Sequence, residues 1–97
     1  MIKVYISGQI TGMPDLNRGA FAHAEAKIYK SGKVPINPHV ICAHLPADST
    51  HKQFMDVCLE ALKYCDEIYM LENWHLSKGA REEQERAVDL GLKGVYE

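Results

Sequence analysis

The stretch of sequence that decides the fold runs from residue 66 to residue 91 and reads DEIYMLENWHLSKGAREEQERAVDLG. Its first part, residues 66–71, ends in the hydrophobic residues 68–71 and has the length of a buried strand. Ser77 is a favourable N-cap and Gly91 a favourable residue just past a helix end, so the second part predicts a helix between them. A strand, a short loop and a helix in this order are typical of one unit of a parallel sheet.

One carboxylate of this helix falls on the side that faces the protein interior. At about 100° per residue, one stripe of the helix contains Ala80, Glu83, Gln84, Ala87, Leu90 and Gly91. An ionised carboxylate on a packed face is costly unless it is paired or lies at a cavity. The spacing alone leaves two interpretations of Glu83 open: a residue at the edge of the buried stripe, or a catalytic or ligand-binding carboxylate in a pocket.

Composition excludes several classes of function. The 97 residues, 46% hydrophobic and 25% charged, indicate one globular domain over residues 1–97. A net charge of −2 with scattered Lys and Arg gives no basic stripe, so we expect no nucleic-acid polymer as partner. No apolar run reaches the length of a membrane span and no signal peptide is visible, so we expect a cytoplasmic protein without a membrane partner.

The cysteines and histidines suggest no disulfide and no metal. Cys42, Cys58 and Cys65 are odd in number and show no CxxC spacing, so we expect reduced, mostly buried thiols. The five histidines have no metal-ligand spacing with a carboxylate or cysteine partner. We therefore expect neither a metal nor another cofactor.

The rest of the chain supplies three further strands and two further helices. The strands are predicted at residues 2–7, 33–38 and 93–96, and the helices at residues 18–31, with Asn17 or Asp15 as N-cap, and 50–64, with Ser49 or Thr50 as N-cap. Residues 8–17 and 39–49 lack periodicity and predict loops, the second with room for one short helical turn. Pro35 restricts the second strand to an edge of the sheet.

Alternation of strands and helices predicts an α/β protein. We expect a three-layer, doubly wound parallel sheet of about four strands in the order 2-1-3-4, flavodoxin-like or Rossmann-like, with right-handed crossovers. In such sheets a ligand binds at the carboxyl ends of the strands, where the strand order reverses. Here that point lies between the first and third strands, and residues 8–13 and 72–77 follow these two strands.

Three features near this point each have two interpretations. The helix start at Ser77 to Gly79 suits an anion such as a phosphate, but is also an ordinary N-cap. Trp74 is suited to stacking on a nucleobase, or to packing or a subunit interface. The loop at residues 8–12, GQITG, is neither a dinucleotide-binding fingerprint nor a phosphate loop.

Several segments together resemble a known superfamily. They are residues 4–14 (VYISGQITGMP), Asn37-Pro38, residues 65–71 (CDEIYML), Trp74 and residues 77–83 (SKGAREE). This set resembles the nucleoside 2-deoxyribosyltransferase superfamily, specifically its small, largely uncharacterised branch related to 2′-deoxynucleoside 5′-monophosphate N-glycosidases. The resemblance implies a nucleoside deoxyribosyltransferase-like fold, a nucleoside or nucleotide as small-molecule partner, and a homodimer or larger homo-oligomer.

The resemblance also implies a site. Glu83 would attack the anomeric carbon of a deoxyribose and Tyr5 would position it, which is the chemistry of a glycosyl-enzyme intermediate. The implied binding residues are Ser77 and Gly79 for a phosphate, and Gly8, Ile10 and Gly12 around the sugar.

One position departs from the superfamily pattern. The characterised enzymes have an aspartate eight residues before the aspartate that opens the third strand, where it contacts the base or protonates it; this chain has Cys58 there. A thiol is a poor proton donor to a purine, and Asp56 lies about 200° away around the helix.

The sequence therefore leaves three functions open. The first is an enzyme that cleaves or transfers an N-glycosidic bond, and the second is a non-catalytic module that binds a nucleotide or related small molecule. The third is a homo-oligomeric interaction protein that uses the aromatic residues Trp74, Tyr64, Tyr69 and Tyr96.

Overall fold

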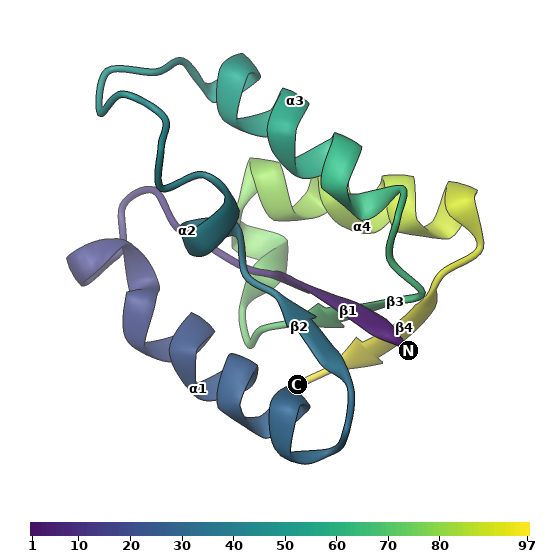
Figure 1. Cartoon of the computed structure of the whole chain (residues 1–97). Helices are drawn as coiled ribbons and strands as arrows, with labels where there is room; N and C mark the ends of the chain where they lie inside the picture. The colour runs from purple at the N-terminus through teal and green to yellow at the C-terminus, as the bar shows by residue number, and fades with distance from the viewer.

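Four parallel strands form the centre of the molecule, in the order β2-β1-β3-β4 (Figure 1). The computed structural model describes residues 1–97. The strands are β1 (Lys3–Ser7), β2 (Val34–Ile36), β3 (Glu67–Met70) and β4 (Lys93–Tyr96). The helices are α1 (Arg18–Lys30), α2 (Pro38–Ile41), α3 (His51–Leu62) and α4 (Lys78–Leu90), with two 3₁₀ turns, η1 (Pro14–Asn17) and η2 (Trp74–Leu76). The predicted strand order and the edge position of the proline-containing strand are confirmed.

Helices cover both faces of this sheet. On one face, Val4 and Ile6 of β1 pack with Phe21, Ala24 and Ile28 of α1. On the opposite face, the buried residues are Tyr5, Cys58, Leu62, Cys65, Ile68, Met70, Ala80 and Ala87, with Cys42 at the end of α2. Because successive strand residues point to opposite faces, β1 contributes to both layers. The three-layer, doubly wound α/β architecture is therefore confirmed.

Capping residues define the ends of the two helices that cover the second face. Thr50 accepts a hydrogen bond from the Gln53 amide, and the Gln53 side chain bonds back to the Thr50 amide, so α3 begins in a capping box. Ser77 accepts from the Ala80 amide at the start of α4, and Gly91 ends that helix at φ 75°. The predicted caps Thr50, Ser77 and Gly91 are confirmed.

The loop after β1 differs from the prediction. Asp15, Leu16 and Asn17 adopt left-handed backbone conformations and form η1, a conformation that non-glycine residues rarely adopt in succession. The Asn17 amide group does not cap α1; it donates to the Gln9 carbonyl at 3.0 Å and closes the loop on itself. The conformational preferences of single residues do not predict this hydrogen bond, because it depends on the positions of β1 and α1 at the two ends of the loop.

Two smaller differences concern helix boundaries and faces. Pro38 to Ile41 form the short helix α2, which matches the one helical turn allowed in residues 39–49 but begins at Pro38, predicted as the end of a strand. Trp74 to Leu76 form a 3₁₀ turn where the sequence predicted a loop. Leu90 is exposed, although the helical stripe placed it inside. No helix combines the length and apolar character needed to cross a membrane.

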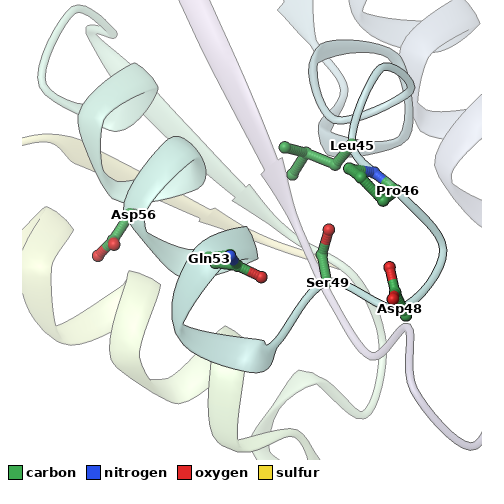
Figure 2. Close-up of a pocket in the computed structure, with 6 residues that line it drawn as sticks. All are labelled: Leu45, Pro46, Asp48, Ser49, Gln53 and Asp56. Atoms are coloured by element: carbon green, nitrogen blue, oxygen red, sulfur yellow. The ribbon is translucent and has the colours of Figure 1, made fainter.

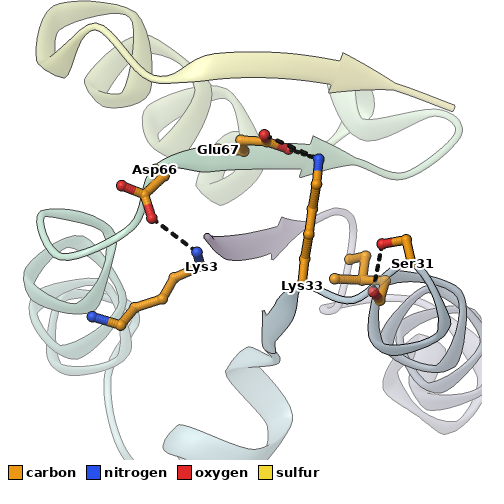
Figure 3. Close-up of polar contacts among 6 residues, drawn as sticks. Lys3, Ser31, Lys33, Asp66 and Glu67 are labelled. Carbon is orange, nitrogen blue, oxygen red and sulfur yellow. Dashed lines mark hydrogen bonds and ion pairs between the residues drawn. The ribbon is translucent and has the colours of Figure 1, made fainter. Parts of the chain in front are cut away.

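Polar contacts fix the amino-terminal ends of the strands (Figure 3). The Lys33 ammonium group lies 3.0 Å from the carboxylate of Glu67, which is only 7% exposed. Asp66 accepts a hydrogen bond from the Lys3 backbone amide at 2.9 Å, and the Ser31 hydroxyl donates to the Ile28 carbonyl at the end of α1. These contacts join β1, β2 and β3 at the end of the sheet opposite to the one where a ligand is expected.

Replacing Lys33 with methionine should destabilise the protein by roughly 2 kcal/mol, because it leaves the buried Glu67 carboxylate without a counter-charge. The loss is smaller than for a fully buried pair, because Lys33 is partly exposed and solvent screens the interaction. Urea unfolding measures the loss. Lys63→Met is the matched control, because Lys63 pairs with Glu60 on the surface and should contribute less than about 0.5 kcal/mol. Equal losses for the two variants would contradict a structural role for the Lys33 pair.

Candidate active site

Glu83 is buried between α4 and the sheet, with both carboxylate oxygens hydrogen-bonded. Tyr5 donates to Oε2 at 2.5 Å and Ser7 donates to Oε1 at 2.7 Å. The Glu83 residue is 6% exposed, while Tyr5 and Ser7 are fully buried. The inward orientation predicted for Glu83 is therefore observed, and the carboxylate is part of a defined polar cluster.

Strand geometry explains why both donors come from β1. Tyr5 and Ser7 are two residues apart, so their side chains point to the same face of the sheet, the face that α4 covers. Ser7 is the last residue of β1, which places the cluster near the carboxyl end of that strand. β1 lies between β2 and β3, so this end of β1 is at the point where the strand order reverses.

Two thiols complete the cluster. Cys58 projects from α3 and its thiol contributes to the electrostatics of both Tyr5 and Glu83. The sulfur of Cys42, at the end of α2, lies 3.7 Å from the sulfur of Cys58. The cysteines are free and buried, and every buried polar side-chain atom has a hydrogen-bond partner.

Burial dominates the protonation equilibria of this cluster. Loss of solvent raises the pKa of Glu83 to about 7, although the hydrogen bonds from Ser7, Tyr5 and Cys58 act in the opposite direction. The pKa of Tyr5 is well above its usual value, because of burial first and the Glu83 charge second. The same two causes raise the pKa of the Cys58 thiol far above its usual value. At neutral pH Tyr5 and Cys58 are therefore protonated, and Glu83 is the group of the cluster that changes charge.

The helix start at Ser77 and Gly79 lies beside the amino-terminal half of α3. A side chain at position 79 would contact His51 and Met55 at 3.4 Å, so Gly79 allows the two helices to approach closely. Ser77 uses its hydroxyl as the cap of α4. The amides of Lys78 and Gly79 precede the first hydrogen bond of the helix and so have no partner within it.

The glycine-containing loop after β1 contributes packing and a turn. Gly8 is buried against Leu71, where an added Cβ would approach side-chain carbons to 2.7 Å. Gly12 is exposed at φ 85°, a conformation that favours glycine. Ile10 packs against the cluster on the α1 face, which is the face opposite to Glu83.

Trp74 is half-buried in η2. It packs against the cluster on the α3 and α4 face, with its ring centroid 6.0 Å from that of Tyr96. The Gln84 amide group donates to the Tyr96 hydroxyl at 3.2 Å, which extends this contact to α4. Of the residues that the sequence singles out, the structure thus brings Tyr5, Cys58 and Glu83 into one cluster. Trp74 packs on the same face, whereas Ile10 packs on the opposite face of the sheet.

A surface hollow lies near this cluster but does not include it (Figure 2). Its lining residues are Leu45, Pro46, Asp48, Ser49, Gln53 and Asp56. They come from the segment after α2 and from the beginning of α3, and the hollow is open to solvent. Asp56 itself points away from Glu83 and pairs with Lys52 at 2.8 Å. A hydrogen-bonded buried carboxylate is a stronger indication of chemistry than a shallow polar hollow, so we place the candidate site at Glu83.

The structure adds two residues that sequence reasoning did not include. Ser7 follows from strand alternation, because a polar residue two positions after Tyr5 must share its face. Cys42 has no such signal, since it reaches Cys58 only because α2 turns the chain back over the sheet. No group of three or more His, Cys, Asp or Glu side chains is arranged to hold a metal ion.

The sheet order, the layers and the helix after β3 define a nucleoside deoxyribosyltransferase-like α/β fold. The structure is similar to that of a 2-deoxyribosyltransferase from Leishmania mexicana, with a TM-score of 0.74, 17% identity, and coverage of 99% of this chain and 63% of that protein. It is also similar to the CMP N-glycosidase BcmB of Clostridium botulinum, with a TM-score of 0.64, 16% identity, and coverage of 97% of this chain and 66% of that one. The chain thus spans about two thirds of the length of these proteins.

The family itself is defined by sequence. The chain belongs to the family described as Domain of unknown function (DUF4406), which matches residues 2–96. No curated protein matches the chain. The identities to the solved structures are low, so these structures establish the fold and not the reaction.

Replacing Glu83 with glutamine should change how stability depends on pH. The pKa of Glu83 is about 7 in the folded protein and near 4.3 in the unfolded chain, so the folded state holds a proton that the unfolded chain has released. Folded stability should therefore fall, by on the order of 3 kcal/mol, as the pH rises between these values. Glu83→Gln removes this loss. The free energy of unfolding of the variant, measured with urea, should therefore increase relative to that of the wild type from pH 5 to pH 8.

Glu85→Gln is the matched control for this measurement. Glu85 is exposed on the same helix and makes no ion pair, whereas the charge of Glu82 acts on Glu83 itself. The control should retain the pH dependence of the wild type. Parallel stability profiles for wild type and Glu83→Gln would contradict the raised pKa.

Proposed function

We propose that this protein binds a deoxynucleoside or its monophosphate at the carboxyl end of the sheet and cleaves or transfers its N-glycosidic bond, with Glu83 as the nucleophile. The observation that carries the proposal is the buried Glu83 carboxylate, held by Tyr5 and Ser7 at the point where the strand order reverses. The fold supports it, because both similar structures are named for transfer or cleavage at a nucleoside. Two hydrogen bonds fix the direction in which the carboxylate can attack.

The reaction would proceed in two steps. An ionised Glu83 oxygen attacks the anomeric carbon, the bond from that carbon to the base nitrogen breaks, and the base leaves with the electron pair. Water then attacks the same carbon and releases Glu83, or a second base takes the place of water in a transfer reaction. Because the pKa of Glu83 is about 7, the reactive carboxylate is present from neutral pH upward. Glu83 is 6% exposed, so a substrate must displace covering side chains before this attack.

We further propose that the start of α4 holds the phosphate of a nucleotide. The free amides of Lys78 and Gly79 and the positive end of the helix dipole favour an anion there. Trp74, in the turn just before this helix, would contact the base. The loop after β1 would border the sugar: Gly12 adds no side chain there, Gly8 packs against Leu71, and Ile10 anchors the loop to the α1 face.

Free base should appear when the protein is incubated with deoxynucleoside 5′-monophosphates and the products are separated by chromatography. Glu83→Gln should abolish the release, since an amide cannot form the intermediate. Tyr5→Phe should lower kcat by at least about 10-fold, because one oxygen of the carboxylate loses its donor. Glu85→Gln, at an exposed position of the same helix, should leave the rate unchanged. Equal release by wild type and Glu83→Gln would overturn the assignment.

A second candidate function is binding without turnover. Two observations favour it. Glu83 is buried, and Cys58 places a thiol at the position where the resemblance places an aspartate. In that case the same assay yields no base, while nucleotides raise the thermal midpoint of wild type and Glu83→Gln alike. The absence of any midpoint shift would contradict both candidate functions.

We also propose that the protein is a homodimer, through the surface around Trp74 and Tyr96. Tyr96 and Trp74 are adjacent and partly exposed, whereas Tyr69 is buried and donates to the Glu97 carboxylate, so Tyr69 is not available for such a contact. An exposed aromatic pair of this kind is typical of subunit interfaces.

Sedimentation at micromolar concentration should therefore give a dimer, and Tyr96→Ser should shift it toward monomer. Tyr29→Ser is the control, because Tyr29 is exposed on α1, the helix that covers the opposite face of the sheet. A wild-type monomer, or equal effects of the two substitutions, would contradict this interface.

A further inference from the structure

Glu83 has no counter-charge. The ion pairs of the structure involve the carboxylates of Asp15, Asp56, Glu60, Glu67 and Glu82, and none involves Glu83. Its partners are the neutral hydroxyls of Tyr5 and Ser7, and the one charged group that acts on it, Glu82, has the same sign. An ionised carboxylate in such a position is stabilised by a cation that enters the site.

The cluster also lacks a competent proton donor. Its other acidic groups are the phenol of Tyr5 and the thiols of Cys58 and Cys42, and burial raises the pKa of each. The Tyr5 and Ser7 hydroxyls already donate to Glu83. Asp56 on α3 and Glu82 on α4 form pairs with basic side chains on the surface. No group in the cluster can therefore transfer a proton readily to a departing base.

These two absences act on the same step of the reaction. When the bond between the anomeric carbon and the base nitrogen breaks, the electron pair stays on the nitrogen. A neutral base would leave as an anion unless it receives a proton, whereas a base that is a cation in the substrate leaves as a neutral molecule. The second kind of substrate needs no acid and also brings the positive charge that Glu83 lacks.

We propose that the substrates of this site are N-glycosides with a cationic base, such as N-alkylated purine or pyridinium nucleotides. This proposal rests on the proposed function of Glu83 and specifies its substrate class. Attack by Glu83 forms the bond to the anomeric carbon and releases the base without proton transfer. Water then replaces Glu83 on that carbon, and one proton goes to solvent for each substrate hydrolysed.

Matched substrates test the proposal. The 5′-monophosphates of 2′-deoxyguanosine and 7-methyl-2′-deoxyguanosine differ in one methyl group and one charge, and a deoxyribosyl nicotinamide monophosphate represents the pyridinium class. For each, kcat/KM is divided by the rate of spontaneous hydrolysis, because cationic bases also leave faster without an enzyme. We expect the wild type to accelerate the cationic substrates at least about 10²-fold more than the neutral one. The two cationic probes separate alkylated purine from pyridinium as the preferred class.

A substitution of Cys58 provides a complementary measurement. Cys58→Asp places a carboxylic acid beside Tyr5 and Glu83, and should increase cleavage of the neutral nucleotide by about 10²-fold while leaving the cationic ones nearly unchanged. It should also add a descending limb to the pH profile of the neutral substrate, as an acid must stay protonated. Cys58→Asn is the matched control, with the same shape and no acid, and should give no increase.

The outcomes are distinct. Equal acceleration of neutral and cationic substrates by the wild type overturns this inference and leaves the proposed function of Glu83 in place. Cleavage of no substrate overturns both. The wild-type comparison decides the question even if Cys58→Asp fails to fold, which near-ultraviolet circular dichroism would reveal.

Discussion

The pair of hydrogen bonds from Tyr5 and Ser7 to Glu83 is the contact on which the arrangement of this protein depends. It joins the central strand β1 to α4, the helix that follows β3, through the interior of the molecule. A carboxylate is an expensive group to bury, and it is retained here at the position where the strand order of the sheet reverses. The surrounding core is apolar, so this cluster is the polar exception in that layer. A core built for stability alone would place an apolar side chain at position 83.

Much of the fold was predictable because it follows from local patterns that agree with one another. Residues 66–71 predicted a strand, and Ser77 and Gly91 predicted the two ends of a helix, as observed in β3 and α4. Pro35 restricts its strand to an edge of the sheet. What the sequence did not predict depends on distant contacts. The left-handed turn at residues 15–17 is closed by Asn17 on Gln9 and has no periodic signal. The sequence allowed one helical turn in the segment of α2, but not its start at Pro38.

The candidate site was predictable in part for the same reason. Helical periodicity placed Glu83 inside, and the resemblance pointed to Tyr5, whereas Ser7 needed only strand alternation and was still missed. Cys42 could not be found, because its contact with Cys58 joins two segments whose relative position depends on the whole layer. The sequence indicated the missing acid through Cys58, but it did not indicate that Glu83 would also lack a cation. The second absence becomes visible only when all neighbours of the carboxylate are known, and it affects the chemistry as much as the residues that are present.

The long separation in sequence between the partners of Glu83 has a consequence for the order in which the molecule is built. Tyr5 and Ser7 lie 78 and 76 residues before Glu83, so the contact is among the least local in the chain. During synthesis β1 is made before α4, so the hydroxyls of Tyr5 and Ser7 have no acceptor until α4 has been made. Contacts between residues far apart in sequence form late in folding, because closing a long loop costs entropy. A partly synthesised or truncated chain would hold the donors without the carboxylate. The Glu83 carboxylate therefore joins its two donors only when the last helix has been made.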